Sequence, residues 1–190
     1  MSRTSIDEGL DAVIRTAVAS KALSARVARV AERYVEVLKA GGTLFFCGNG
    51  GSAADAQHIA AEYIVRYSGA RKPLAALALT TDTSVLTAAG NDLGFEEVFA
   101  RQVEALCSTK DLLVIHSTSG ESPNLLAAVR TARKCGVSTV AFLGKGGGAL
   151  AALVDEAIVV PSNETSLVQL MHLAFQHLIV ESVEAELFGA

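Results

Sequence analysis

The sequence predicts an α/β fold: a doubly wound, Rossmann-like or flavodoxin-like five-stranded parallel sheet flanked by helices, with extra N-terminal helices. Five short apolar runs are continuous rather than alternating, which is typical of strands covered on both faces. Segments of helical periodicity separate these runs, as in a parallel sheet built from strand–helix units. The chain has 190 residues, is 51% hydrophobic and contains no linker or low-complexity stretch, which predicts a single domain over residues 1–190.

Residues 1–40 predict two helices outside the repeating unit. Apolar residues recur at helical spacing between Ile6 and Val18 and again between Val27 and Leu38. The pair Gly41-Gly42 then ends the second helix, as a left-handed C-cap requires. Because these helices and the last helix carry an excess of apolar residues, we expect them to pack in the interfaces of an oligomer.

The strand–helix units follow in order along the rest of the chain. The predicted strands lie at residues 43–47, 74–79, 111–116, 137–143 and 157–160. The predicted helices cover 52–67, begin at 80–82, begin again at Pro123, and end with a long helix over 164–187.

Charge and composition exclude several classes of protein. A formal net charge of −4 argues against a domain that tracks nucleic-acid phosphates, because such domains carry a basic face. No apolar run approaches the ~18 residues that span a bilayer, and residues 1–10 do not resemble a signal peptide. We therefore expect a cytoplasmic protein without nucleic-acid or membrane partners. The three cysteines form no Cys-x-x-Cys pair, which indicates reduced thiols rather than disulfides or a zinc ribbon.

Two loops that follow predicted strands are candidate phosphate sites. Both precede a helix, whose N-terminus attracts anions, and ligands bind outside the carboxyl ends of parallel strands. The glycine-rich loop contributes Asn49, Gly50, Gly51 and Ser52, and the hydroxyl-rich loop contributes Ser117, Thr118, Ser119 and Ser122. The alternative is that these residues only form turns and helix caps. A third loop, 144–148 with Lys145, is expected mainly to turn the chain.

The phosphate is expected to belong to a small sugar rather than to a nucleotide. The Gly-x-x-x-x-Gly-Lys-Ser/Thr motif is absent. Gly48-x-Gly50-x-x-Ala53 meets the relaxed dinucleotide pattern, but the second predicted strand does not end in the acidic residue that this pattern needs.

Histidines and carboxylates supply candidate chemistry beside these loops. His58 and Glu62 are one helical turn apart, which suits either a metal pair or a base with a residue that orients it. On the last helix, the spacing of Gln169 and His177 does not by itself predict a metal site. We interpret His172 as a surface or supporting polar residue, and His116 as a structural histidine with satisfied hydrogen bonds.

Four segments resemble the phosphoheptose isomerases of the sugar-isomerase (SIS) domain family. They are residues 47–62, 78–84, 90–92 and 117–124, and the resemblance extends from about residue 40 to 186. It implies an SIS fold and a homotetramer with active sites at subunit interfaces. It also implies conversion of D-sedoheptulose 7-phosphate to D-glycero-D-manno-heptose 7-phosphate, the first step of heptose supply for bacterial lipopolysaccharide core or other heptosylated products.

The same resemblance implies roles for individual residues. Glu62 would be the catalytic base and His177 the acid that act on an enediol. One zinc ion per subunit would be bound by His58, Glu62, Gln169 and His177. Contacts to the sugar phosphate would come from Asn49, Gly50, Gly51, Ser52, Glu62, Asn91, Asp92, Ser117, Thr118, Ser119, Ser122 and Gln169. Arg66 matches a family arginine and is either a substrate contact or an exposed helix charge.

The last helix departs from the family pattern. An Arg-Ile-Gln-Glu segment is typical of the family, whereas this chain has Leu167-Val168-Gln169-Leu170. Two further hypotheses therefore stay open. One is an SIS isomerase of another ketose phosphate. The other is a non-catalytic SIS regulator similar to the DnaA-associated replication initiator protein, which lacks the metal and acid–base residues.

Overall fold

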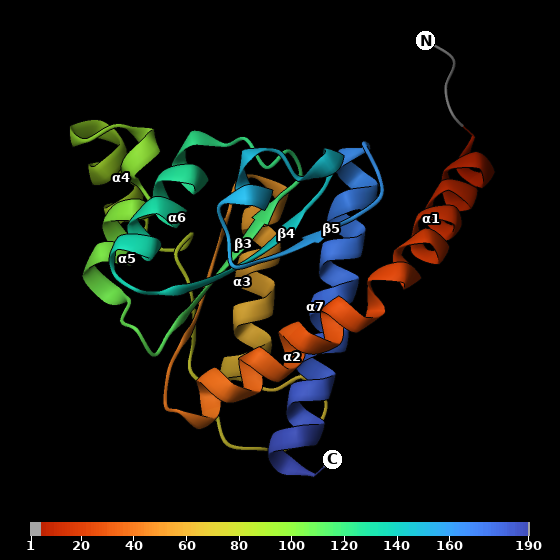
Figure 1. Ribbon diagram of the computed structural model, residues 1–190, viewed down its shortest axis with the longest axis horizontal. Coiled ribbons are helices and arrows are strands. Elements are labelled where there is room, and N and C mark those ends of the chain that lie inside the picture. The colour runs from red at the N-terminus through yellow and green to blue at the C-terminus, as the bar shows by residue number, and fades with distance from the viewer. Residues whose placement is uncertain (1–4, 190) are drawn as a thin grey trace.

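The computed structural model describes residues 5–189, and it confirms the parallel α/β sheet (Figure 1). The strands are β1 (Leu44–Gly48), β2 (Ala76–Ala78), β3 (Leu112–Ser117), β4 (Ser138–Leu143) and β5 (Glu156–Val159). The α-helices are α1 (Ile6–Ser20), α2 (Ser24–Lys39), α3 (Gly51–Ile64), α4 (Thr83–Asp92), α5 (Ala100–Leu106), α6 (Pro123–Lys134) and α7 (Thr165–Phe188). The sheet order is β2-β1-β3-β4-β5, and every pairing is parallel.

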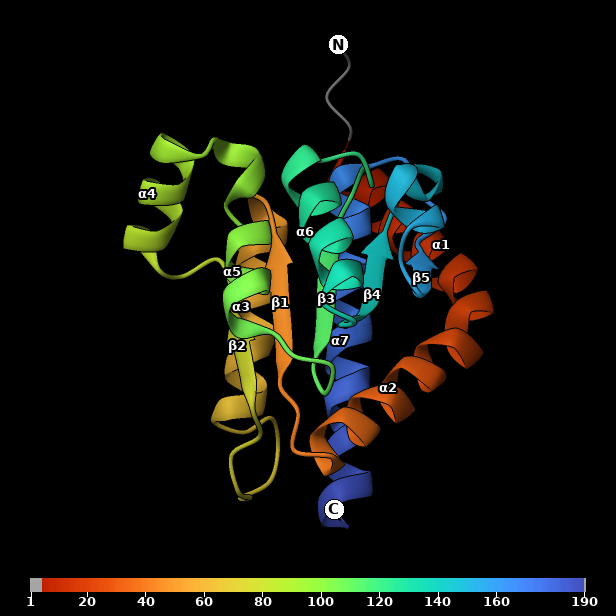
Figure 2. The same cartoon turned by 60° about the vertical axis from the view of Figure 1, so that its left-hand side comes forward.

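Alternate residues of each strand supply two separate cores. Phe46 and Val114 belong to the core under α2, α3 and α7, whereas Phe45 and Ile115 belong to the core under α5 and α6. Figure 2 shows the sheet between these two layers of helices. Burial on both faces is why the strands are continuously apolar. The order reverses between β1 and β3, so the loops after these two strands flank the switch point where ligands bind in such sheets.

The N-terminal helices form as the sequence predicts, but only α2 is packed closely in the body. The Ser5 hydroxyl accepts a hydrogen bond from the Glu8 amide, and the Glu8 carboxylate accepts one from the Ser5 amide, which makes a capping box at the start of α1. In Figure 1, α1 projects from the body near the first turns of α7. Within residues 5–189, no helix is long and apolar enough to cross a bilayer.

Two differences from the sequence prediction concern the connections. The short helix α5 was not expected, since it has only seven residues between β2 and β3. Residues 65–67, predicted as the end of a helix, lie beyond α3, which stops at Ile64. The chain turns there because the Arg71 side chain donates hydrogen bonds to the Glu62 and Tyr63 carbonyls at the end of α3.

Candidate active site

The two predicted phosphate loops line one cavity of about 290 Å³ at the carboxyl end of the sheet. Its lining contains the residues of the two loops that the sequence singled out, together with His116, Leu125 and two residues of the last helix: Asn49, Gly50, Gly51, Ser52, His116, Ser117, Thr118, Ser119, Ser122, Leu125, Thr165 and Gln169. Among residues 5–189, no lysine or arginine lines it. A phosphate here would be held by amides, hydroxyls and the N-termini of α3 and α6, so the acidic net charge of the chain does not oppose an anionic ligand.

Side chains lock the two loops to each other. The amides of Asn49 and Asn124 exchange two hydrogen bonds, of 2.9 and 2.8 Å between nitrogen and oxygen. The Ser117 hydroxyl accepts the Gly120 amide at 3.0 Å, which tightens the second loop. Gly120 has φ +69°, and a Cβ there would collide with the Gly147 carbonyl. The loop at 144–148 therefore serves as a support for the hydroxyl-rich loop, and Lys145 is not among the residues that line the cavity.

A second group of polar side chains lies between α3 and α7. The ligand atoms of His58, Glu62 and His177 all lie within 4.8 Å of one another. The two Nε2 atoms of the histidines are 3.0 Å apart, and Nε2 of His58 lies 3.5 Å from the Glu62 carboxylate. The His58 side chain is 48% exposed, so the group is open to solvent on one side. We refer to these three residues as the His–Glu cluster.

The donor set of the His–Glu cluster fits a zinc ion. Two imidazole nitrogens and one carboxylate are the ligands of many catalytic zinc sites, which leave a position free for a water or substrate oxygen. Gln169 lines the cavity, and its side-chain amide occupies the space next to Gly51 that a Cβ would fill. A Cβ at Gly51 would be 2.7 Å from the Gln169 Nε2 atom, so the missing side chain makes room for this amide.

Asn91 and Asp92 are not brought to the cavity within this chain. They lie at the end of α4, both exposed, and the Asn91 side-chain amide donates to the Asp92 carboxylate at 2.7 Å. Figure 2 shows α4 standing apart from the helices that carry the His–Glu cluster. Arg66 is exposed just beyond the end of α3.

Two histidines are fully buried, and one of them, His172, lies deeper than the sequence suggested. His172, predicted as a surface or supporting residue, is fully buried, and its Nε2 atom lies 3.1 Å from the Leu143 carbonyl oxygen. His116 is also fully buried, as expected of a structural histidine; its Nε2 atom accepts a hydrogen bond from the Gln176 amide at 2.9 Å. Its Nδ1 atom has no partner among the described residues, so the prediction of satisfied hydrogen bonds is wrong for this atom. Helical spacing could not reveal the burial of His172, since α7 is apolar on nearly every face.

The comparisons with known proteins agree with the fold. The family model for the SIS domain matches residues 10–144. A phosphoheptose isomerase of Bradyrhizobium sp. is 52% identical over 93% of this chain and 89% of its own length. Phosphoheptose isomerase 1 of Campylobacter jejuni is 51% identical over 87% of this chain and 89% of its own. The structure of phosphoheptose isomerase GmhA from Neisseria gonorrhoeae superposes with a TM-score of 0.90 at 38% identity, covering 95% of this chain and 97% of that one. This chain therefore belongs to the SIS domain family and, within it, to the phosphoheptose isomerases, which are aldose–ketose isomerases.

Proposed function

We propose that the chain converts D-sedoheptulose 7-phosphate to D-glycero-D-manno-heptose 7-phosphate and so supplies heptose for lipopolysaccharide in the cytoplasm. The single observation that carries this proposal is the His–Glu cluster, which forms between α3, the helix that begins at the cavity, and α7. His58 lies about two turns, roughly 10 Å, along α3 from Gly51. A phosphate held at the helix N-terminus would therefore leave the far end of an extended seven-carbon sugar near the cluster.

The chemistry is a proton transfer between two neighbouring carbons. The Glu62 carboxylate takes a proton from C1 of the ketose while O2 gains one, which gives an enediol. Return of a proton to C2, with loss of the O1 proton, gives the aldose, and the His177 imidazole is the proposed donor to C2. The phosphate loops hold the other end of the sugar, so that C1 and C2 stay near Glu62 and His177.

The proposed cofactor is one zinc ion per subunit. His58, Glu62 and His177 would hold it, with Gln169 as a further ligand when its side chain turns from Gly51. A zinc ion there polarises the carbonyl oxygen of the substrate.

The first prediction is that the purified protein contains about one zinc per chain and isomerises sedoheptulose 7-phosphate. Removing zinc with a chelator should abolish turnover, and adding zinc back should restore it. Zinc is measured by elemental analysis and the product by NMR. Absence of both zinc and turnover would favour the non-catalytic SIS regulator.

The choice of substrate needs a separate measurement, because the exposed Leu170 and the buried Leu167 replace charged residues of the family. Relative kcat/KM values for several ketose phosphates show whether sedoheptulose 7-phosphate is the preferred one.

We propose further that the whole chain is one SIS domain and that four copies form a homotetramer with interfacial active sites. Ile6, Leu10, Ile14 and Val18 form an apolar stripe along α1, and each is between 57% and 84% exposed. A groove between α2 and α7 is also apolar. Monomeric proteins rarely leave such surfaces uncovered. In this arrangement, α4 of a neighbouring copy would bring Asn91 and Asp92 to the cavity.

The second prediction follows from the α1 stripe. Replacing Leu10 and Ile14 together by Glu should reduce the tetramer to smaller species, because buried charges without partners oppose association. Light scattering coupled to size-exclusion chromatography measures the mass. The matched control is Arg15→Glu, which changes charge on an exposed position beside the stripe and should leave the mass unchanged. A wild-type mass for the double variant would exclude the stripe from the interface.

A further inference from the structure

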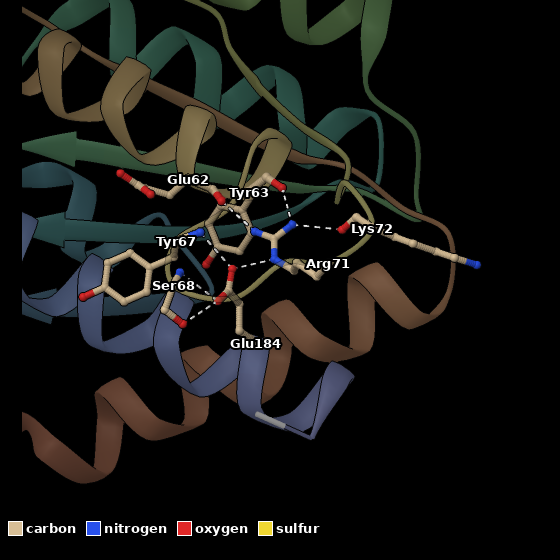
Figure 3. A network of polar contacts seen from close by, with 7 residues as sticks. All are labelled: Glu62, Tyr63, Tyr67, Ser68, Arg71, Lys72 and Glu184. Atoms are coloured by element: carbon tan, nitrogen blue, oxygen red, sulfur yellow. Dashed lines mark hydrogen bonds and ion pairs between the residues drawn. The ribbon is translucent and has the colours of Figure 1, made fainter.

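A buried ion pair connects the segment that follows α3 to α7, and Figure 3 shows it together with Glu62 of the His–Glu cluster. The Arg71 Nε atom lies 2.5 Å from a carboxylate oxygen of Glu184, and the two side chains are only 2% and 3% exposed. Arg71 also donates to the backbone carbonyls of Glu62 at 2.6 Å and Tyr63 at 2.8 Å. These are among the last four carbonyls of α3, which no amide of the same helix can satisfy. One guanidinium therefore caps α3 and joins it to α7.

Glu184 extends the connection to the segment that follows α3. Its two carboxylate oxygens accept the backbone amides of Tyr67 at 2.9 Å and Ser68 at 3.1 Å, and also the Ser68 hydroxyl at 3.1 Å. Burial tends to raise the pKa of this carboxyl, but the hydrogen bonds from Tyr67, Arg71 and Ser68 outweigh it and lower the pKa to about 2. Glu184 is therefore ionised throughout the neutral range, and every one of these contacts favours its charged form.

Two routes lead from this ion pair to the His–Glu cluster. The first runs through Glu62, whose backbone carbonyl is held by Arg71 while its carboxylate points away from the guanidinium (Figure 3). The second runs through Tyr67. Its amide is held by Glu184, and its ring stacks on the imidazole of His177, with 5.5 Å between ring centroids and 25° between planes.

The helix geometry places both ends of the second route on one face of α7. His177 and Glu184 are seven residues apart, which is about two turns of helix and nearly the same azimuth. A shift of the 65–75 segment along α7 would therefore move the Tyr67 ring off His177, and a shift of the α3 end would move Glu62.

We propose that Arg71 and Glu184 are positioning residues that hold Glu62, through its main chain, and His177, through the Tyr67 ring, in the geometry of the His–Glu cluster. This inference rests on the proposed metal centre. Neither residue touches the cavity or the three ligand atoms, so their effect on binding is indirect. Supporting interactions of this kind orient metal ligands in many zinc proteins, and their loss typically weakens metal affinity 10- to 100-fold.

The same helix offers a matched control. The Lys39 ammonium and the Glu186 carboxylate are 2.9 Å apart, but their side chains are 55% and 62% exposed. This pair joins α2 to α7 two residues beyond Glu184 and contacts neither α3 nor the segment after it. Glu186→Gln removes the same charge from the same helix without disturbing either route to the cluster.

The experiment compares Glu184→Gln, Arg71→Lys and Glu186→Gln in the full chain. Zinc affinity is measured by competition with a chelator, well below the unfolding temperature of each variant. Separately, the imidazole signals of His58 and His177 are recorded by NMR in the metal-free protein. We expect at least tenfold weaker zinc binding and shifted imidazole signals in the first two variants, and wild-type values in Glu186→Gln.

The two readouts separate the possible failures. If the wild type binds no zinc, the metal centre is wrong, and the imidazole signals still decide whether the ion pair positions the histidines. If folded Glu184→Gln and Arg71→Lys variants keep wild-type affinity and signals, the ion pair only stabilises the fold and the inference is overturned. Should both variants fail to fold, Tyr67→Leu leaves the ion pair intact. It should still shift the His177 signal, and an unchanged signal would refute the route through the ring.

Discussion

Replacing Glu62 by Gln is expected to lower kcat at least ~100-fold, because the amide cannot take the proton from C1. The substitution preserves size and leaves the main chain of Glu62, which Arg71 binds, unchanged. KM for sedoheptulose 7-phosphate should change much less, since the loops proposed to hold the phosphate line a cavity to which Glu62 does not contribute. Steady-state kinetics of the purified variant with this substrate provides the measurement.

Zinc content must be measured on the same sample, since Glu62 is both proposed base and proposed ligand. A variant that retains zinc and loses turnover identifies the carboxylate as the base. A variant that loses zinc as well shows that ligation is its larger contribution. Glu181→Gln is the matched control, because Glu181 is exposed and one turn from His177 on α7. Near-normal turnover of the Glu62→Gln variant would exclude Glu62 as the base.

The parts of the fold and site that depend on local sequence were predictable. The five strands appear within two residues of their predicted positions, because burial on both faces leaves a continuous apolar run that polar loops interrupt. That the glycine-rich and hydroxyl-rich loops would lie together was predictable for a related reason: the carboxyl ends of neighbouring parallel strands meet at one edge of the sheet, where both loops line one cavity. His58 and Glu62 share a face of α3 by spacing alone, and the structure confirms their proximity.

The parts that depend on tertiary packing were not predictable. Nothing in the spacing of α7 shows that His177 meets His58, since the contact depends on how α3 and α7 pack side by side on one face of the sheet. Glu184 looks like an ordinary helix charge in sequence, yet it is buried against Arg71. Asn91 and Asp92 illustrate a different limit. One chain leaves them exposed on α4, and the contact proposed for them would come from a neighbouring copy.

The stability of the protein is expected to fall steeply as pH drops from about 6.5 toward 4, because two buried histidines stay neutral in the fold. Burial, and to a smaller extent the neighbouring His172, lower the pKa of His116 to about 3. Burial also lowers the pKa of His172 to about 4, although its hydrogen bond to the Leu143 carbonyl opposes the shift. The rings lie 5.9 Å apart between centroids. Gln176 donates a hydrogen bond to Nε2 of His116. In a protonated ring this nitrogen carries a hydrogen and cannot accept that bond.

The sign and size of the effect follow from proton uptake. Unfolded histidines bind protons near pH 6.5, whereas the folded pair binds them only below about 4, so acid favours the unfolded chain. Between pH 8 and 4.5, this linkage removes on the order of 5 kcal/mol, roughly half from each ring. Glu184 adds little in this window, because its own contribution is lost only as pH falls from about 4.5 toward its folded pKa of about 2.

Urea unfolding of the metal-free protein at several pH values measures the loss, and a substitution identifies its source. His116→Leu removes one of the two buried groups, so the slope of unfolding free energy against pH between 5 and 6 should fall by about half. If the slope of the His116→Leu variant equals that of the wild type, the acid sensitivity comes from carboxylates instead. A halved slope would show that His116 stays neutral in its buried position between the sheet and α7. Nε2 of His116 can accept the Gln176 hydrogen bond only in that neutral form.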